Sequence, residues 1–226
     1  MKISAEFIVS AAGPRDFPRG GLPEIAMVGR SNVGKSSLIN ALVRQKVART
    51  SAAPGKTRLA NVYRVAKGSA PPFFLVDLPG YGYARRVRPG GAPAQDLEPD
   101  GGGFEALTEA YFARDEAVAL LLVDTRHPGL ASDRAAWQWI QRVAVKAAVV
   151  GTKIDKLARG ERIRALRQLE SVFEDAVLPV SAVTGEGLDE LWKLIDRLAN
   201  SLKPQPHSSP SSPVATEPHR PKSPRR

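Results

Sequence analysis

The sequence contains no cysteine and no long run of apolar residues. Without cysteine the chain can form neither a disulfide nor a thiolate metal site, and a reducing compartment suits this composition. Its longest apolar run, Ala117 to Val123, is far too short to span a bilayer. Residues 1–7 lack the apolar block of a signal peptide. We therefore expect a soluble, cytoplasmic protein without a membrane partner.

Acidic residues are fewer than basic ones. The chain carries 23 Asp and Glu against 33 Lys and Arg, a formal net charge of +10. The segment that begins at Lys203 contributes +4 of this charge, and the rest of the chain keeps +6. Such a charge favours a polyanionic partner, usually nucleic acid or a ribonucleoprotein. The alternative is a basic surface that serves only solubility, because net charge does not specify a partner.

Composition divides the 226 residues into three parts. Residues 1–23 form an N-terminal extension with one short strand, Ala5 to Val9, and a Gly- and Pro-rich connector. Residues 24–202 carry the apolar runs and periodic stretches of a single α/β domain. Residues 203–226 are rich in Pro, Ser and basic side chains. They cannot bury enough apolar surface to fold, so we expect a disordered tail.

The clearest motif lies between two apolar stretches, Ile25 to Val28 and Leu38 to Val43. A strand, a glycine-containing loop and a helix in this order predict a phosphate-binding loop, because backbone N–H groups and the helix N-terminus converge on an anion. Lys35 would reach the β- and γ-phosphates, and the hydroxyl of Ser36 would ligate Mg²⁺. The nucleotide contacts predicted for this loop are Gly29, Arg30, Ser31, Asn32, Val33, Gly34, Lys35, Ser36 and Ser37.

The segment 45–58 joins the predicted phosphate-binding helix to the next predicted strand, Leu59 to Val65. Its sequence Pro-Gly-Lys-Thr at 54–57 would by itself predict only a turn. Downstream of a phosphate loop, however, it lies where a nucleotide-sensing segment would, and Thr57 is the best candidate for a second hydroxyl ligand to Mg²⁺. The predicted contacts in this segment are Gly55, Lys56, Thr57, Arg58 and Leu59.

Asp77 ends an apolar strand that begins at Phe73, so it stands where ligands gather in open α/β sheets. A carboxylate in this position can hold Mg²⁺ through water. Gly80 has no side chain, so its N–H can approach a γ-phosphate and respond to its loss. The predicted contacts are Asp77, Leu78, Pro79 and Gly80. The Gly- and Pro-rich stretch 81–103 predicts a nucleotide-gated loop, with a passive linker as the alternative.

A third group of residues predicts which base is bound. The carboxylate of Asp155 can accept both N1–H and the exocyclic amino group of guanine, and adenine would leave it unpaired. The stem of Lys153 could cover the base plane, and small residues after the next strand could let backbone amides reach the guanine carbonyl. The predicted contacts are Thr152, Lys153, Ile154, Asp155, Val180, Ser181 and Ala182. The alternative is that Asp155 only caps a helix.

Together these motifs resemble the GTPases of the translation-factor-related class, and the match is close to the bacterial ribosome-biogenesis GTP-binding family of the EngB type. The resemblance runs from about Glu6 to Leu202, and the motifs that carry it are residues 29–37, 54–58, 76–84, 123–127, 152–157 and 180–182. It implies Mg²⁺-dependent binding of GTP and GDP, slow hydrolysis, a role in assembling the large ribosomal subunit, and an association with cell division and septation. We expect a monomer, and we assign Lys35, Thr57 and Gly80 to hydrolysis.

The expected fold is a doubly wound α/β P-loop GTPase domain with about six mostly parallel strands and helices on both faces. GTP should lie across the carboxyl ends of the strands. Ser36 and Thr57 should ligate Mg²⁺ directly, and Asp77 should hold it through water. Two features depart from the family pattern: the insertion 88–103 is longer than its usual switch, and Thr152 stands where most GTPases have Asn.

Tyr81 stands where signalling GTPases have the Gln that orients the attacking water, so intrinsic turnover should be slow. Asn32 stands where some related GTPases bind K⁺, so either K⁺ or a ribosomal partner should supply the missing electrostatic stabilisation. Two other functions stay open. One is a signalling or trafficking GTPase, against which the missing lipidation motif and the basic composition argue. The other is an RNA-binding scaffold with a vestigial nucleotide site, against which the intact Lys35, Ser36, Thr57 and Asp77 argue.

Overall fold

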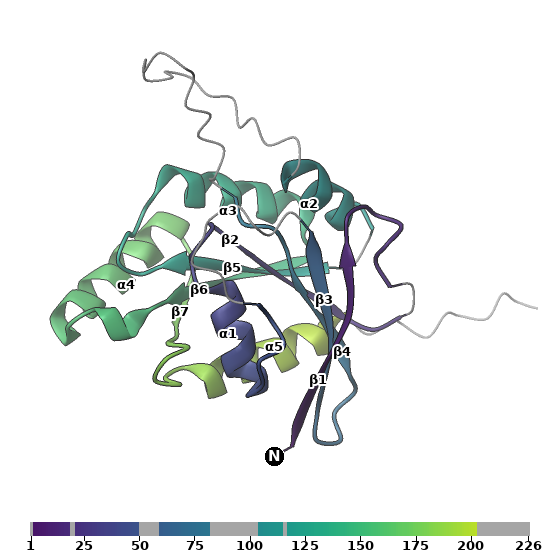
Figure 1. The fold of residues 1–226 in the computed structure, drawn as a ribbon. Coiled ribbons are helices and arrows are strands. Elements are labelled where there is room, and N and C mark those ends of the chain that lie inside the picture. Colours follow the sequence, from purple (N-terminus) through teal and green to yellow (C-terminus); the bar gives the residue numbers. More distant parts are fainter. Residues whose placement is uncertain (1, 19–20, 50–58, 82–103, 115–116, 203–226) are drawn as a thin grey trace, which may run out of the picture.

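The structure is a computed structural model that describes residues 2–18, 21–49, 59–81, 104–114 and 117–202 (Figure 1). Across these ranges seven strands form one sheet, in the order β1-β3-β4-β2-β5-β6-β7. The strands are β1 (Ile3–Ala11), β2 (Glu24–Gly29), β3 (Ala60–Lys67), β4 (Phe73–Asp77), β5 (Ala117–Asp124), β6 (Lys146–Thr152) and β7 (Val177–Pro179). The helices are α1 (Lys35–Val43), α2 (Phe104–Phe112), α3 (Ala131–Val143), α4 (Arg159–Phe173) and α5 (Leu188–Ser201), with a 3₁₀ turn, η1, at Ile154–Lys156.

The middle of the sheet is parallel and buried. Strand β2 pairs in parallel with β4 on one side and with β5 on the other, and β5 continues through β6 to β7. Every residue of β4 and of β5 is buried, as expected for strands covered on both faces. The predicted α/β architecture with a mostly parallel sheet is therefore confirmed.

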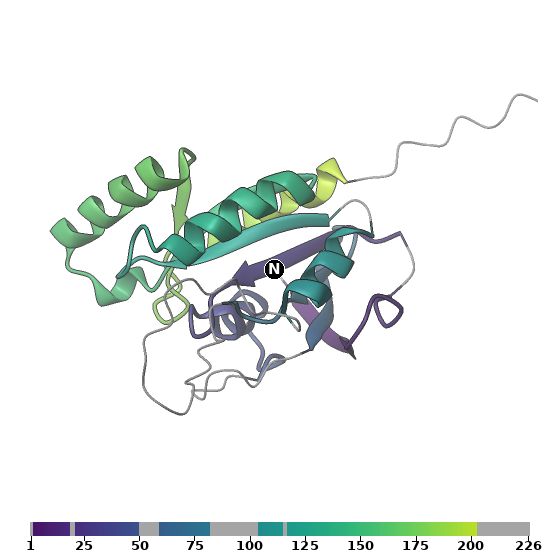
Figure 2. The same cartoon turned by 90° about the horizontal axis from the view of Figure 1, so that it is seen from above.

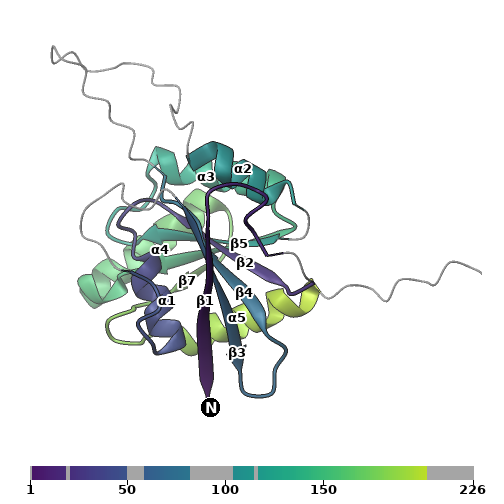
Figure 3. The same cartoon turned by 45° about the vertical axis from the view of Figure 1, so that its right-hand side comes forward.

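The sheet has seven strands where six were expected, because the N-terminal strand joins it. Strand β1 pairs antiparallel with β3, which in turn pairs antiparallel with β4. Its exposed and partly buried positions alternate along much of its length, as in a strand with one solvated face. The pairing shifts register between Phe7 and Val9, which indicates a β-bulge in this edge strand. Figure 3 shows β1 running along the near edge of the sheet.

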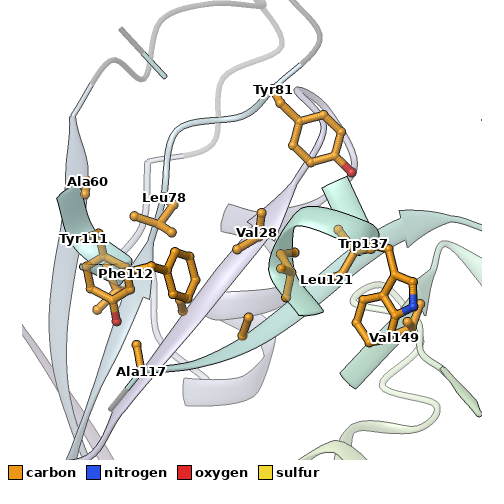
Figure 4. Close-up of a cluster of buried hydrophobic side chains, with 14 of the residues drawn as sticks. Val28, Ala60, Leu78, Tyr81, Tyr111, Phe112, Ala117, Leu121, Trp137 and Val149 are labelled. Atoms are coloured by element: carbon orange, nitrogen blue, oxygen red, sulfur yellow. The ribbon is translucent and has the colours of Figure 1, made fainter. Parts of the chain in front are cut away.

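Two layers of helices cover the sheet (Figures 1 and 2). Helices α2, α3 and α4 pack on one face, where Tyr111, Trp137 and Phe173 join the buried cluster that Figure 4 shows in close-up. Helices α1 and α5 pack on the other face, where Leu38 and Trp192 belong to a second cluster. The predicted doubly wound arrangement thus has two cores, one on each side of the parallel strands.

The strand order defines one edge of the sheet as the place for a ligand. From β2 the chain passes to β3 and then to β4 on one side, and from β4 it returns past β2 to β5 on the other. Ligands of open α/β sheets bind at the carboxyl ends of the strands where the order reverses in this way. Gly29, Asp77, Asp124 and Thr152 all end strands of this central group, so the loops that follow them share that edge.

None of the helices in the described ranges is long and apolar enough to cross a membrane.

Candidate functional site

The predicted phosphate loop joins β2 to α1. Gly29 ends β2, residues 30–34 form the loop, and Lys35, Ser36 and Ser37 open the helix. Gly34 has a left-handed backbone with φ 109°, and its carbonyl accepts the N–H of Leu38 at 2.8 Å, the first bond of the helix. No side chain caps this helix N-terminus. Its first N–H groups and the positive end of its dipole therefore point to the loop, as an anion site requires.

Lys35 and Asp77 form a buried pair beside the loop. The ammonium of Lys35 donates to the carbonyl of Gly29 at 3.0 Å, and the hydroxyl of Ser36 donates to Asp77 Oδ2 at 3.3 Å. Burial lowers the pKa of Lys35, and the charge of Asp77 partly opposes this shift. Burial raises the pKa of Asp77, while the charge of Lys35 and the hydrogen bond from Ser36 oppose it. Both groups carry a desolvation cost that an incoming phosphate and cation would relieve.

The side-chain oxygens of Asp77 and Ser36 fit a magnesium ion. Asp77 is 3% exposed, and its Oδ1 is buried without a hydrogen-bond partner among the described residues. Buried carboxylate oxygens are normally paired, so an unpaired one beside a serine hydroxyl indicates a place for a cation. Carboxylate and hydroxyl oxygens belong to the hard ligands that Mg²⁺ prefers. Thr57, the other expected ligand, lies outside the described residues together with Gly55, Lys56 and Arg58.

The segment after β4 lies directly against the phosphate loop. A Cβ on Gly80 would stand 2.8 Å from both the backbone nitrogen and the hydroxyl of Ser31, so only glycine fits there. The N–H of Ser31 donates to the carbonyl of Tyr81 at 3.2 Å, and Arg30 and Tyr81 form an isolated parallel bridge. Leu78 anchors this segment through a fully buried side chain. Leu59, from the preceding predicted contact set, is described as well and is 39% exposed.

Tyr81 turns its side chain into the protein. Its hydroxyl donates to Asp133 Oδ1 of α3 at 2.9 Å, and Arg30 Nε lies 3.9 Å from the same oxygen. Burial, followed by the charge of Asp133, raises the pKa of Tyr81 far above its ordinary value, so the phenol stays protonated. Figure 4 shows its ring among the side chains between the sheet and α3. A hydroxyl held this way matches the prediction that Tyr81 does not replace the missing Gln.

The residues predicted to recognise the base come together from two loops. Asp155 Oδ1 accepts the hydroxyl of Ser181 at 2.7 Å, and this hydrogen bond is the main cause of a lowered pKa for Asp155. Ile154 is fully buried, and its N–H donates to the carbonyl of Val180 at 3.4 Å. The first position before η1 is occupied by Lys153, and no side chain caps this turn. The arrangement disfavours the alternative in which Asp155 serves only as a helix cap.

Thr152 and Lys153 connect the base loop to the phosphate loop. The hydroxyl of Thr152 lies 2.8 Å from the carbonyl of Val33 and 3.1 Å from that of Val123. The ammonium of Lys153 donates to the carbonyl of Asn32 at 2.6 Å and to Asp124 Oδ2 at 2.9 Å. Thr152 therefore binds backbone carbonyls, a structural use that its position in the motif did not indicate.

The structure adds two carboxylates to which the sequence analysis assigned no role. Asp133 accepts a hydrogen bond from Tyr81 and lies near Arg30. Asp124 forms ion pairs with Lys153 and Arg126. The signal for Asp124 was its place just beyond a buried strand, next to Arg126. No comparable signal marked Asp133, which lies within a helix that otherwise reads as ordinary packing.

Comparison with known proteins shows which family the chain belongs to. Residues 24–153 match the family model described as a 50S ribosome-binding GTPase. With the phosphate loop and the sheet order, this match makes the chain a P-loop GTPase. It is 40% identical over 207 residues to the probable GTP-binding protein EngB of Alkaliphilus oremlandii, a match that covers 88% of this chain and 94% of that protein. It is 42% identical over 205 residues to the probable EngB of Pelotomaculum thermopropionicum, covering 87% and 96% respectively. The chain therefore belongs to the EngB family of GTP-binding proteins.

Solved structures agree on the fold. The crystal structure of Aquifex aeolicus Era bound to GDP·AlF4⁻ is 27% identical, with a TM-score of 0.62. That match covers 79% of this chain and 57% of the Era chain, so this chain spans little more than half of it. The crystal structure of a probable GTP-binding protein EngB has a TM-score of 0.55 at 22% identity, and covers 79% of this chain and 99% of that one. The protein accordingly binds GTP and GDP and hydrolyses GTP.

The hydrogen bond between Tyr81 and Asp133 should contribute to stability. We expect Tyr81→Phe to lower the free energy of unfolding by about 1–3 kcal/mol, because the buried carboxylate of Asp133 loses a donor. Urea denaturation measures the change. Tyr63→Phe is the matched control, since the Tyr63 hydroxyl makes no hydrogen bond within the described ranges. Equal losses for the two variants would show that the contact to Asp133 contributes nothing.

Proposed function

We propose that this GTPase is a nucleotide-gated switch in the assembly of the large ribosomal subunit, and that it acts in the cytoplasm and is needed for normal cell division and septation. The observation that carries the proposal is the match of residues 24–153 to a family described as 50S ribosome-binding GTPases. The net charge of +10 supports it, because a basic protein attracts the phosphates of ribosomal RNA.

At the phosphate end of the site, backbone N–H groups and charged side chains would bind the nucleotide. The loop 29–37 would surround the phosphates with N–H groups at the start of α1, and the ammonium of Lys35 would add a positive charge. Ser36 and Asp77, with Thr57, would hold Mg²⁺, which when bound neutralises charge on the β- and γ-phosphate oxygens. Gly80 lies against Ser31 at the rim of this loop, so loss of the γ-phosphate would change the contacts of Gly80.

The base end would select guanine through Asp155. Its carboxylate is kept charged by Ser181 and is 2.7 Å from that hydroxyl, so it can accept two N–H groups of guanine. The loop of Val180, Ser181 and Ala182 would supply backbone amides to the guanine carbonyl. Thr152 would support the base indirectly, by holding the carbonyls of Val33 and Val123.

Asp155→Asn should change the preferred nucleotide from GTP to XTP. Xanthine carries a carbonyl where guanine carries its amino group, so an amide that can donate suits it better than a carboxylate. We expect the affinity for GTP to fall by about 100-fold or more and the affinity for XTP to rise. Titration with both nucleotides measures this, and Asp175→Asn is the control, because this exposed aspartate precedes β7, at the opposite end of the strand from the base loop. An unchanged affinity for GTP in Asp155→Asn would remove Asp155 from the site.

Hydrolysis would need a positive charge beyond that of Arg30, whose Nε faces the carboxylate of Asp133 at 3.9 Å. We propose that K⁺ provides it near Asn32, whose exposed side chain makes no hydrogen bond within the described part of the chain. Replacing K⁺ by Na⁺ should slow hydrolysis by about tenfold or more at saturating GTP. Asn32→Gly should abolish the difference, since glycine tolerates the left-handed backbone of Asn32 (φ 63°) while removing the carboxamide. Equal rates in the two salts would leave a ribosomal partner as the source of stabilisation.

The partner would be recognised in part through α4. This helix carries Arg159, Arg162, Arg164 and Arg167 against two glutamates, and Arg164 and Arg167 are exposed. Helix α5, on the opposite face of the sheet, has exposed Lys193 and Arg197 among more acidic neighbours. The two helices therefore offer matched sites for charge reversal.

Co-sedimentation with large-subunit particles tests the proposed partner and the switch together. We expect binding with a non-hydrolysable GTP analogue and loss of binding with GDP. The double variant Arg164→Glu/Arg167→Glu should bind about tenfold more weakly at low salt, because two phosphate contacts become repulsive. Lys193→Glu/Arg197→Glu makes the same change in net charge and should bind as the wild type does. Binding that depends on salt alone, or no binding at all, would favour a signalling or trafficking GTPase over a ribosomal one.

A further inference from the structure

Asp124 is a buried carboxylate that gathers two cations at the nucleotide edge of the sheet. Its side chain is 3% exposed. Arg126 donates through Nε to Oδ1 at 2.9 Å and through Nη2 to Oδ2 at 2.7 Å, and Lys153 donates to Oδ2 at 2.9 Å. Burial alone would raise the pKa of Asp124, but the hydrogen bonds from Arg126 and Lys153 outweigh it and hold this pKa well below its usual range. Asp124 is therefore a fixed negative charge.

Lys153 connects the carboxylate of Asp124 to the phosphate loop. Its ammonium also donates to the carbonyl of Asn32 in the phosphate loop at 2.6 Å. Its Cε lies 3.7 Å from the position that a Cβ on Gly34 would occupy, so the stem runs along the loop. The backbone of Lys153 is left-handed, with φ 62°, which costs free energy in a residue other than glycine. Strain of this kind persists only where surrounding contacts enforce it.

A purely structural role would not need this arrangement. Apolar residues of similar volume often replace a buried ion pair at no loss of stability, so a charged pair by itself is weak evidence for a stabilising role. Here the charges come from the carboxyl ends of two adjacent parallel strands. Asp124 and Arg126 lie at the end of β5, and Lys153 follows β6. Arg126 also lies close enough to Asp155 for that charge to raise its pKa.

We propose that Asp124 is a positioning residue for the guanine nucleotide. It holds the ammonium of Lys153 against the carbonyl of Asn32, so that the aliphatic stem of Lys153 presents a flat apolar surface to the base. Asp124 itself does not touch the nucleotide. This inference rests on the proposed location of guanine between Lys153 and Asp155, and it adds the residue that sets the conformation of Lys153.

A double-mutant cycle on the full chain tests the proposal. Dissociation constants for GDP and for GTP are measured for the wild type, Asp124→Asn, Lys153→Met and the double variant. We expect each single variant to bind GDP and GTP about 10- to 100-fold more weakly, and to the same extent for both. We expect the double variant to bind no more weakly than Lys153→Met alone, because Asp124 acts only through Lys153. Losses that add in the double variant would overturn the proposal.

Steady-state kinetics separates positioning from damage to the fold. A contact to the base is the same in the bound ground state and in the transition state, so the loss in Asp124→Asn should appear in KM rather than in kcat. A lowered fraction of folded protein would reduce the apparent kcat instead. Glu24→Gln is the control, because it weakens the Arg114–Glu24 ion pair (3.1 Å) at the opposite end of β2 and should leave KM unchanged.

The remaining outcomes are equally decisive. If Lys153→Met binds nucleotide as the wild type does, the anchored ammonium is not needed and the inference fails, whereas the proposed location of the base is tested separately by Asp155→Asn. If Lys153→Met binds weakly while Asp124→Asn does not, only the inference fails. If Asp124→Asn does not fold, Asp124→Glu takes its place in the cycle, because it keeps the charge but moves it by about one C–C bond, roughly 1.5 Å. Its loss should likewise vanish in the Lys153→Met background, and an additive loss would overturn the proposal.

Discussion

The burial of two opposite charges, Lys35 and Asp77, beside the phosphate loop is the constraint on which the rest of the site depends. Two opposite charges lie in a place from which water is largely excluded, and burial shifts the pKa of each toward its neutral form. Such a pair adds little to the stability of a fold, because desolvation offsets most of its attraction. Its use lies in what it offers to a ligand. A triphosphate with its cation would give Lys35 an anion and the unpaired oxygen of Asp77 a cation, so that binding would release a cost already present in the folded chain.

The phosphate loop is held from both sides by contacts that involve no nucleotide. On the β4 side, Tyr81 accepts the N–H of Ser31 and reaches Asp133. On the β6 side, the side chains of Thr152 and Lys153 bind the carbonyls of Val33 and Asn32. The loop therefore starts close to the shape that an anion needs, and less ordering has to accompany binding. The same contacts connect the loop to α3 and to β5, so a shift of the loop would be transmitted to one face of the sheet and to its central strands.

The sequence predicted what depends on local pattern. Apolar runs that end in a charged or small residue located β2, β4, β5 and β6, and parallel pairing then brought Gly29, Asp77 and Thr152 to one edge. Contacts that depend on tertiary geometry could not be predicted in the same way. Lys153 and Asn32 are 121 residues apart, and Tyr81 and Asp133 are 52 apart. No periodicity relates either pair. The length of the edge strand β1 and its place in the sheet were not predicted for the same reason. Its partly exposed pattern does not say which strand it will pair with, and in the structure it pairs with β3.

The identity of residue 81 shows how a motif can keep its place while its chemistry changes. A Gln at this position would need a side chain free to turn toward the γ-phosphate. The tyrosine instead uses its hydroxyl to pair a buried aspartate and its ring to fill the core beneath α3, so its conformation is set by packing. Freeing it would leave the carboxylate of Asp133 with Arg30 at 3.9 Å as the nearest charged partner within the described residues, a poor substitute for the 2.9 Å hydrogen bond. The contact with Asp133 thus stabilises the start of the segment after β4 and holds the side chain of residue 81 away from a catalytic role. Under the function proposed above, the charge stabilisation for hydrolysis would come from outside residue 81, and the rate would depend on what else is bound.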